Sequence, residues 1–503
     1  MVSTAKTGAS GKRAHGLRLL AACLSAGSVL GTGFPASAQS TQQPFPSAPM
    51  QQDANAPLAD AAAQDTAAAA AQDTAPAAAA SEPVDADAAP NPVTGSVANV
   101  DAEALDLGRM NLREAPLGAI PTRRLRDDLE APGIRLGTMV LRPSVIQNLG
   151  TETTRSGGSK ETRTYWETGL RGTLTSDWSR HELTVTGEGY WQKNISGQGD
   201  TDPRANIDAD LRLDLSGNTI AHLRAGYGFS REDTDDPNAV SGAAVQSGIH
   251  RFTGGASLEH DFGRLRGTVA ADVERWRYSA AELSDGTRVS LSDRDRIAGT
   301  LRARIGYEIS PALTPFLEAS IGRILYDERT DAQGYARSAD VYAAKAGISA
   351  DFGEKLRGEL GLGYRKQVFD DSRLSYIAAV TVDGNVFWSP QRGTDVNIGL
   401  STTIDPSTTA GLSGSVIYAL NAAVTHQVRS NLVARLTGST TWTEYGASSG
   451  TGDTVAYAAG AGLSYSLNRY LDLTGDIGYE LTDRQSAADT QVWRAMVGLT
   501  AKR

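Results

Sequence analysis

The chain has 503 residues, a formal net charge of −10 and a single cysteine. Its apolar runs are too short for a membrane-spanning helix, which needs about 20 residues. No basic run of the kind that binds nucleic acid is present, which argues against a DNA or RNA partner. This length would ordinarily suggest about two to four domains, but no Pro/Gly/Ser linker interrupts residues 134–503, so one large sheet fits this region better.

Residues 1–38 are predicted to be a signal peptide. Lysines and arginines precede a short apolar run at 19–30, and Ala36-Ser37-Ala38 has the small-x-small form of a signal-peptidase site. We therefore expect export and cleavage between Ala38 and Gln39.

The cysteine supports a rival interpretation of this leader. Leu20-Ala21-Ala22-Cys23 fits the motif at which lipoproteins are cleaved and lipidated. Against it, Arg18 interrupts the apolar stretch upstream, and the apolar run continues past the cysteine. Cleavage at Ala38 would leave a mature chain without a thiol or a disulfide.

Two segments of different composition follow the leader. Residues 39–100 consist mainly of Ala, Gln, Asp, Thr and Pro, and contain no Lys or Arg. Such a segment cannot bury enough apolar surface to fold, so we expect a disordered periplasmic tail that spans roughly 40–45 Å. Residues 101–133 carry leucines, then arginines within 123–126 and carboxylates within 127–130. They predict a short linker that is either an amphipathic helix or a plug in the lumen.

From residue 134 to the C-terminus, segments of about a dozen residues alternate apolar with polar side chains. In 204–216, alanine, isoleucine and leucine occupy every second position, and charged residues fill most positions between them. We expect strands at 134–148, 162–176, 181–195, 204–216, 219–232, 248–261, 265–282, 295–309, 313–327, 338–351, 356–370, 374–388, 394–405, 412–427, 432–445, 454–467, 471–484 and 490–502. A bulge or a strand end is expected at Pro143, which cannot donate to a ladder.

The connections between these strands alternate in length. Those after even-numbered strands are short turns such as 217–218, whereas those after odd-numbered strands are mostly long and polar, as at 150–161 and 233–247. No helical segment is available to cover the aliphatic faces, so lipid is the expected partner layer. The sequence thus predicts an all-β fold, a transmembrane antiparallel up-and-down β-barrel of about 18 strands. An even count places both ends of the sheet in the periplasm.

The alternation also predicts which side chains face lipid and which face the lumen. Leu301 should point outward and Arg302 inward, because neighbouring residues of a strand project to opposite sides. Aromatic residues near strand ends predict interfacial girdles: Trp166, Trp191, Tyr227, Tyr326, Phe369, Trp388, Trp442, Tyr445, Tyr465, Tyr470 and Trp493. The candidate lumen-lining residues are Arg171, Asp208, Asp210, Arg212, Arg302, Arg304, Glu308, Glu359, Asp476 and Glu480.

No motif in the chain predicts catalysis, a cofactor or a metal. The histidines lack metal-ligand spacing, and His222 has no obvious serine partner for a nucleophilic site. The acidic residues at 232–236 and 293–295 suit either divalent cations shared with lipopolysaccharide or a solvated loop. We therefore predict a protein that is not an enzyme.

The stretch from Gly133 to Ser144, with the sequence GIRLGTMVLRPS, resembles the opening strand of a porin-like family of outer-membrane β-barrel proteins of Gram-negative bacteria. In layout the resemblance covers about 370 residues. It implies a location in the outer membrane. Because related barrels are associated with export of capsular or extracellular polysaccharide, it also implies this export as a second candidate function. One departure is the C-terminal sequence from Leu499 to Arg503, because barrels of this kind commonly finish with an aromatic residue that the assembly machinery recognises.

Two functions remain open from the sequence. The first is a passive channel for small hydrophilic solutes, and it rests on the mixed-charge inner face. The second is a barrel that exports surface polysaccharide or anchors the envelope, and it rests on the tail at 39–100. The expected partners are outer-membrane lipid and lipopolysaccharide, the barrel-assembly machinery, and cell-wall or polysaccharide-export proteins.

Overall fold

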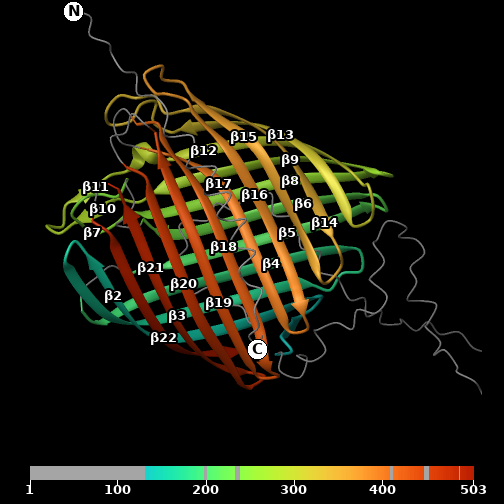
Figure 1. Cartoon of the computed structure of the whole chain (residues 1–503), viewed down its shortest axis with the longest axis horizontal. Helices are drawn as coiled ribbons and strands as arrows, with labels where there is room; N and C mark the ends of the chain where they lie inside the picture. The colour runs from blue at the N-terminus through green and yellow to red at the C-terminus, as the bar shows by residue number, and fades with distance from the viewer. Residues whose placement is uncertain (1–130, 198–200, 233–237, 408–411, 447–451, 486–487) are drawn as a thin grey trace, which may run out of the picture.

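The computed structural model describes residues 131–197, 201–232, 238–407, 412–446, 452–485 and 488–503. Within them, a 19-stranded antiparallel sheet includes β1, whose described pairing is with β2. The other eighteen strands form a closed ring, because the first of them, β2, pairs with the last, β22 (Figure 1). The predicted fold class is therefore confirmed. The proposed leader and tail, and most of the 101–133 linker, lie outside the described residues.

The strands of the ring follow one another in chain order. They are β2 (Met139–Ser156), β3 (Ser159–Ser176), β4 (His181–Ser196), β5 (Arg204–Ser216), β6 (Thr219–Arg231), β8 (Gly248–Phe262), β9 (Leu265–Tyr278), β12 (Arg296–Tyr307), β13 (Leu313–Tyr326), β14 (Ala339–Asp351), β15 (Leu356–Phe369), β16 (Ile377–Gln391), β17 (Thr394–Pro406), β18 (Gly414–Arg429), β19 (Leu432–Tyr445), β20 (Thr454–Asn468), β21 (Leu471–Arg484) and β22 (Thr490–Lys502). Outside the ring lie β1 (Ile134–Leu136), β7 (Ala243–Val245), β10 (Ala281–Leu283), β11 (Arg288–Val289) and the 3-10 helix η3 (Ser292–Arg294).

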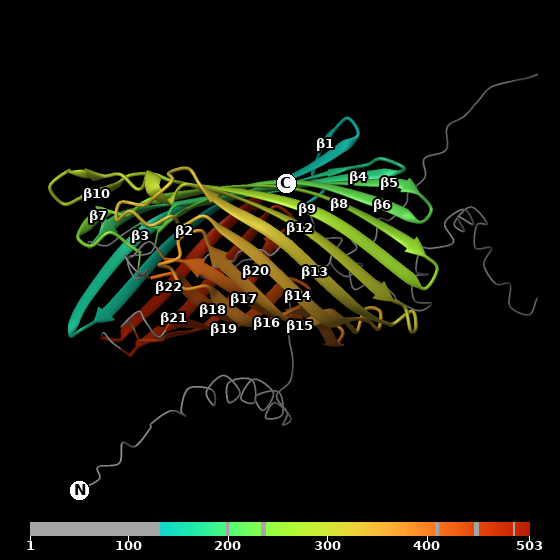
Figure 2. The same cartoon turned by 90° about the horizontal axis from the view of Figure 1, so that it is seen from above.

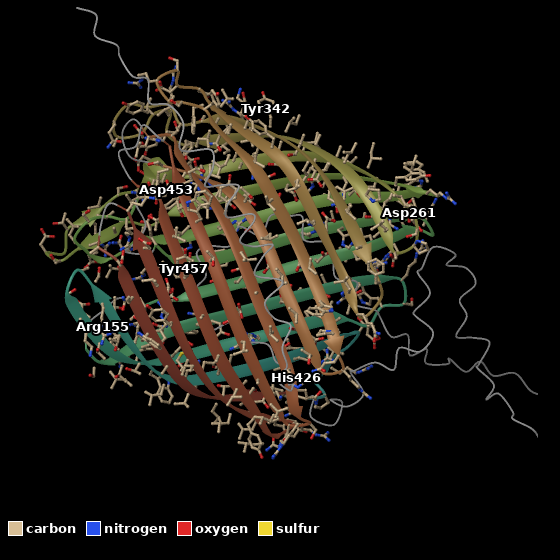
Figure 3. All side chains as sticks on the ribbon, viewed as in Figure 1. Arg155, Asp261, Tyr342, His426, Asp453 and Tyr457 are labelled. Atoms are coloured by element: carbon tan, nitrogen blue, oxygen red, sulfur yellow. The ribbon has the colours of Figure 1, made fainter. Side chains whose placement is uncertain are left out.

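The two ends of the barrel differ in their connections. We call one the turn end, since it carries tight connections such as 217–218 and 263–264, and the other the loop end, since it carries 327–338 and 370–376. Figure 3 shows Asp261 and His426 toward the turn end, and Arg155 and Asp453 toward the loop end. Figure 2 shows β4, β5, β6 and β8 in one wall and β16–β19 in the opposite wall. Among the described residues, no helix is long and apolar enough to cross a membrane.

The predicted first strand and first outer loop are wrong. Residues 134–136 form a short hairpin arm against β2, and β2 and β3 continue to Ser156 and Ser159. Gly157 and Gly158, with φ of 56° and 88°, make a two-residue turn of the kind that requires positive φ at both positions. Residues 151–156 are all polar, so no apolar residues alternate with them. Periodicity alone could therefore not show that they belong to a strand.

The bulge expected at Pro143 is also wrong. Pro143 pairs with Gly172 of β3 in a ladder without a register shift. Its carbonyl oxygen accepts a 3.0 Å bond from the backbone N–H of Arg503, so its nitrogen faces the same side, where β22 has ended. The missing donor therefore costs only the return bond to Arg503, at the end of this ladder.

One face of each strand is apolar and exposed, as a lipid-facing surface must be. Along β12, Leu301 and Ile305 are 51% and 63% exposed, while Arg302 between them lies on the opposite face. Exposed aromatic residues lie toward both ends of this surface: Trp191 and Trp493 toward the loop end, and Trp388, Tyr465 and Tyr470 toward the turn end. Two girdle predictions are wrong, because Phe369 is buried and Tyr326 faces inward beside Arg296.

Candidate functional site

The inner face of the barrel carries ion pairs that reach across several strands. Arg304 of β12 binds both carboxylate oxygens of Glu359 on β15, one of them at 2.9 Å. Neighbouring strands lie about 4.8 Å apart, so three spacings on a flat sheet would separate these side chains too far. Curvature brings them together only on the concave side, which places the pair inside the barrel.

Further charges extend this cluster along the inner wall. Glu318 of β13 lies 3.7 Å from Arg304 and 3.5 Å from Lys345 of β14. Lys345 in turn lies 3.7 Å from Asp383 of β16. Cations and carboxylates therefore alternate along these contacts from β12 to β16, and we call this cluster the mixed-charge wall.

The ring of Phe316 packs against Arg304 of the mixed-charge wall. The guanidinium of Arg304 lies 3.5 Å from the centre of the Phe316 ring. That ring covers Gly347, the residue opposite it on β14, and reaches Gly361 on β15. Glycine is needed at 347, because a Cβ there would overlap the Phe316 ring and the carbonyl oxygen of Leu360.

Gly347→Ala is expected to destabilise the barrel by about 1–3 kcal/mol, the usual cost of overpacking a filled site. The measurement is the urea midpoint of the refolded protein in detergent micelles. Gly299→Ala is the matched control, since a Cβ on that outward glycine meets nothing within 4 Å. Equal midpoints for the two variants would contradict the packing role of Gly347.

A cavity of about 150 Å³ lies toward the loop end, lined by residues from β9 to β17. Arg296 is buried at its edge, and the centres of the Trp276, Tyr278 and Tyr326 rings lie 4.6, 5.8 and 6.0 Å from its guanidinium. Arg296 also donates a 3.1 Å bond to the Tyr278 hydroxyl. Aromatic faces thus stabilise a cation that bulk water does not reach.

Toward the loop end, the backbone pairing between β16 and β17 stops. Their ladder runs from Gly384–Leu400 to Gln391–Thr394, and beyond Leu400 the two strands no longer pair. Alternation from Leu400 would point Thr402 outward, yet Thr402 is 1% exposed and lines the cavity. Its hydroxyl accepts from the Val382 N–H at 2.9 Å and its own N–H donates to Asp383 at 3.1 Å, so side-chain bonds replace ladder bonds here.

The loops above this seam are joined by a buried ion pair. Arg337 and Asp331 bind each other through side chains that are each 2% exposed. Arg337 also donates to the carbonyl oxygens of Ser407 and, at 2.9 Å, Leu412. We call this arrangement the loop latch, because it ties the loop at 327–338 to the connection between β17 and β18.

An ion pair between Arg373, whose side chain is exposed, and Asp371 lies beside the loop latch. Bonds from the Arg373 side chain, and from the backbone N–H groups of Arg373 and Ala336, hold the pKa of Asp371 below its usual range. A depressed pKa means that the contribution of this carboxylate to stability is present above its unfolded pKa and is lost only as the pH falls through the lower folded value.

A third cluster links the first and last strands of the ring near the loop end. Glu152 of β2 accepts from Arg163 of β3 at 2.9 Å and from Arg494 of β22 at 2.6 Å. Arg494 also donates to Glu480 of β21 at 3.1 Å. This network therefore fastens the closing seam of the barrel.

The structure distributes the predicted lumen-lining residues over several pairs. It brings Arg304 and Glu359 together, joins Glu480 to the closing seam, and places Arg302 3.4 Å from Asp272. The remaining pairs and contacts are Arg171 with Glu188 at 2.9 Å, Asp210 with His222 at 2.9 Å, Arg212 with Asp214 at 3.1 Å, Asp476 with Arg435 at 2.7 Å, and Asp208 with Asn206. Glu308 lies one residue beyond β12, where its N–H binds the carbonyl oxygen of Arg264.

Several residues of these clusters were not among the sequence candidates. They are Glu152, Arg163, Glu318, Lys345, Asp383 and Arg494. Alternation alone assigns Glu318 and Lys345 to inward positions, so a complete list of polar inward residues would have found them. It could not show which of them meet, because that depends on the curvature of the sheet.

The described histidines bind neighbouring groups of the wall. His260 and His426 contact the hydroxyls of Thr219 and Thr394 on the adjacent strands, and His250 contacts the hydroxyl of Tyr227. In the acidic loop segments, Glu232 is buried and binds Arg294 at 2.9 Å, whereas 233–237 lie outside the described residues.

Comparisons with known proteins also indicate a β-barrel. Residues 127–503 match a family model described as "Putative beta-barrel porin 2". Similar solved structures include OpdL and OpdK of Pseudomonas aeruginosa, each with 12% identity, a TM-score of 0.36, and coverage of 72% of this chain and 99% of theirs. OccAB4 of Acinetobacter baumannii has 10% identity and a TM-score of 0.37 over 72% of this chain and 98% of its own. No curated protein sequence matches. TM-scores this low do not assign the chain to a family. The match of residues 127–503 to the family model does.

Proposed function

The chain belongs to the beta-barrel porin 2 family, and from this premise we propose that it is a passive outer-membrane channel for small hydrophilic solutes. The observation that supports this proposal most directly is the mixed-charge wall inside a closed ring of eighteen strands. Rings of 16–18 strands are wide enough for an aqueous lumen. Charged inner residues of both signs would solvate passing solutes and sort them by charge and size.

Reconstitution in planar bilayers tests the channel. The purified full chain is expected to give discrete conductance steps in KCl, because ions can cross a polar lumen without leaving water. Folding is verified by the heat-dependent mobility of the barrel in gels. A folded sample that remains electrically silent would contradict the proposed function.

Ion selectivity tests whether the mixed-charge wall borders the path of the ions. Glu359→Gln removes one negative charge beside Arg304, so the reversal potential in a KCl gradient should move toward the chloride equilibrium potential. The control is Asp177→Asn, the loss of a similar charge from the exposed turn between β3 and β4. An equal effect of both substitutions would show that the wall does not control selectivity.

The location and partners follow from the same proposal. The apolar outward surface suits outer-membrane lipid and lipopolysaccharide, and the barrel-assembly machinery would insert the strands. We infer that the turn end faces the periplasm, so that residues 39–100 would lie there after cleavage between Ala38 and Gln39. Porin-family membership favours transport over catalysis. Export of surface polysaccharide remains the alternative, and it depends on residues 39–100, which lie outside the described residues.

A further inference from the structure

At the loop end, the backbone of β17 lies on the lumenal side of β16. The side chain of Asp383 points into the barrel, where it lies 3.7 Å from Lys345 of the mixed-charge wall. The backbone N–H of Thr402 donates to this carboxylate at 3.1 Å, in place of a ladder bond to the backbone of β16. Because its acceptor is an inward side chain, this amide has left the plane of the sheet toward the lumen.

The loop-end half of β17 nevertheless keeps the pattern of a lipid-facing strand. Its outward positions continue with Ile404 and Pro406, and the polar Thr403 and Asp405 alternate with them. In the structure Ile404 is 8% exposed, and it lines the inner cavity together with Pro406. An apolar row that suits lipid is therefore held inside the barrel.

The inner face of β16 is covered at the same height. Ala379 and Thr381 alternate with the outward Val380, and both are buried. Ile377 contacts the β17–β18 pair itself, because its Cδ1 lies 3.1 Å from the position that a Cβ on Gly414 would take. The two strands therefore overlap in two layers, where a barrel wall has one.

This overlap brings β17 close to a distant part of the ring. Asp405 interacts electrostatically with Arg296 of β12, and Pro406 lines the same cavity as Arg296. β17 follows β12 by five strands in the ring, which corresponds to roughly 24 Å along the wall at about 4.8 Å per strand. The end of β17 thus narrows the lumen at the loop end.

We propose that residues 401–406, with the start of β18 that pairs with them, form a flap that gates the loop end of the lumen. The closed position is the overlap seen in the structure. In the open position the flap joins the wall, and its ladder with β16 continues in the same register through Val380–Ile404 and Ala378–Pro406. The gating role rests on the proposed channel, whereas the movement of the flap does not.

Each position of the flap has its own set of stabilising contacts. Closed, the flap is held by the bonds of Thr402 to β16 and by the loop latch, in which Arg337 donates to the carbonyl oxygen that follows β17. Open, the edge of β16 regains ladder bonds, which matter next to lipid because no water can replace them there. Ile404 would then face hydrocarbon, as its place in the alternation predicts.

Disulfide trapping tests the movement of the flap without relying on the proposed function. In a full chain carrying Cys23→Ser, Val380→Cys is combined with Ile404→Cys, and the barrel is refolded under reducing conditions and then oxidised mildly. The closed flap keeps the two positions apart, because Val380 is 58% exposed on the outer surface and Ile404 is buried inside. The open flap places them opposite each other with a Cα distance of about 5.5 Å, which suits a disulfide. We expect this flap pair to cross-link in the folded barrel.

Two further variants make the result decisive. Val386→Cys with Ile398→Cys is the control pair, since these residues face each other within the ladder that the structure shows, and it should link rapidly. Arg337→Ala opens the loop latch, so it should speed the linking of the flap pair. If the control pair links and the flap pair stays unlinked with and without Arg337→Ala, the flap does not move and the proposal is overturned.

Conductance tests the gating, and this arm rests on the proposed channel. Cross-linking the flap pair should raise the conductance per channel, because the flap is then held in the wall, and reducing the disulfide should reverse the rise. Cross-linking the control pair should leave the conductance unchanged. Equal conductance of the linked and reduced flap pair would overturn the gating role. Silence of every sample, including the unmodified chain, would instead count against the channel, and the cross-links would still decide whether the flap moves.

Discussion

Replacing Arg337 by alanine is expected to destabilise the loop end of the barrel by roughly 3–5 kcal/mol, the cost of breaking a buried ion pair by removing one partner. The substitution would leave Asp331 buried without its cation and would remove the donor to two carbonyl oxygens of the β17–β18 connection. The measurement is the rate at which a protease cleaves the 327–338 loop in the folded protein, which should rise sharply.

Arg373→Ala provides the matched control for the loop latch. Arg373 binds Asp371 and donates to the carbonyl oxygen of Gly334 in the same 327–338 loop, but its side chain is 56% exposed. Bonds of an exposed side chain contribute less than those of a buried one, so cleavage of the loop should rise less in this variant than in Arg337→Ala. Similar rates for the two variants would show that burial of the Arg337 pair does not stabilise these loops.

Leu301→Arg is expected to impair assembly of the barrel. The side chain is 51% exposed on the apolar face, where an arginine near the middle of the bilayer costs about 2–4 kcal/mol. The measurement is the fraction of protein that reaches the folded, heat-modifiable form in lipid vesicles.

Thr300→Arg places the same side chain at the adjacent position, opposite Asp272 on the inner face. It should assemble normally, because the new cation would face a carboxylate and water rather than hydrocarbon. Cysteine labelling gives an independent readout, in which position 302 reacts with a water-soluble maleimide and position 301 resists it in vesicles. The reverse pattern of assembly or labelling would mean that the assignment of the two faces is wrong.

The alternation of side chains was sufficient to predict the barrel and most of its strands. The structure reproduces the expected bounds of β5, β19, β21 and β22, where aliphatic and charged residues contrast strongly. It departs at the polar 151–156 stretch, where both faces are hydrophilic because the β2–β3 hairpin carries little lipid-facing surface. Alternation of apolar and polar side chains reveals a strand only where its two faces differ in polarity.

The contacts of the inner face were harder to predict, for a different reason. The sequence assigns Arg304 and Glu359 to the same side of the sheet, but their meeting requires the sheet to curve across β13 and β14. Alternation could not predict the burial of Thr402, because β17 leaves β16 there and exchanges ladder bonds for side-chain bonds while its ladder with β18 continues. Tyr326 was wrongly placed at the membrane surface because it lies near a strand end, although alternation from the outward Leu325 assigns it to the inner face, beside Arg296.

The closing of the ring by β2 and β22 has a consequence for how the chain folds. The bond from Arg494 to Glu152 joins residues 342 positions apart, so the contact order of this pairing is among the highest a chain of this length allows. Until β22 docks, β2 presents an unpaired edge that can template aggregation with another chain. β22 is the last strand of the ring in chain order, so the open edge of β2 has to be protected from self-association until every other strand of the ring has been synthesised.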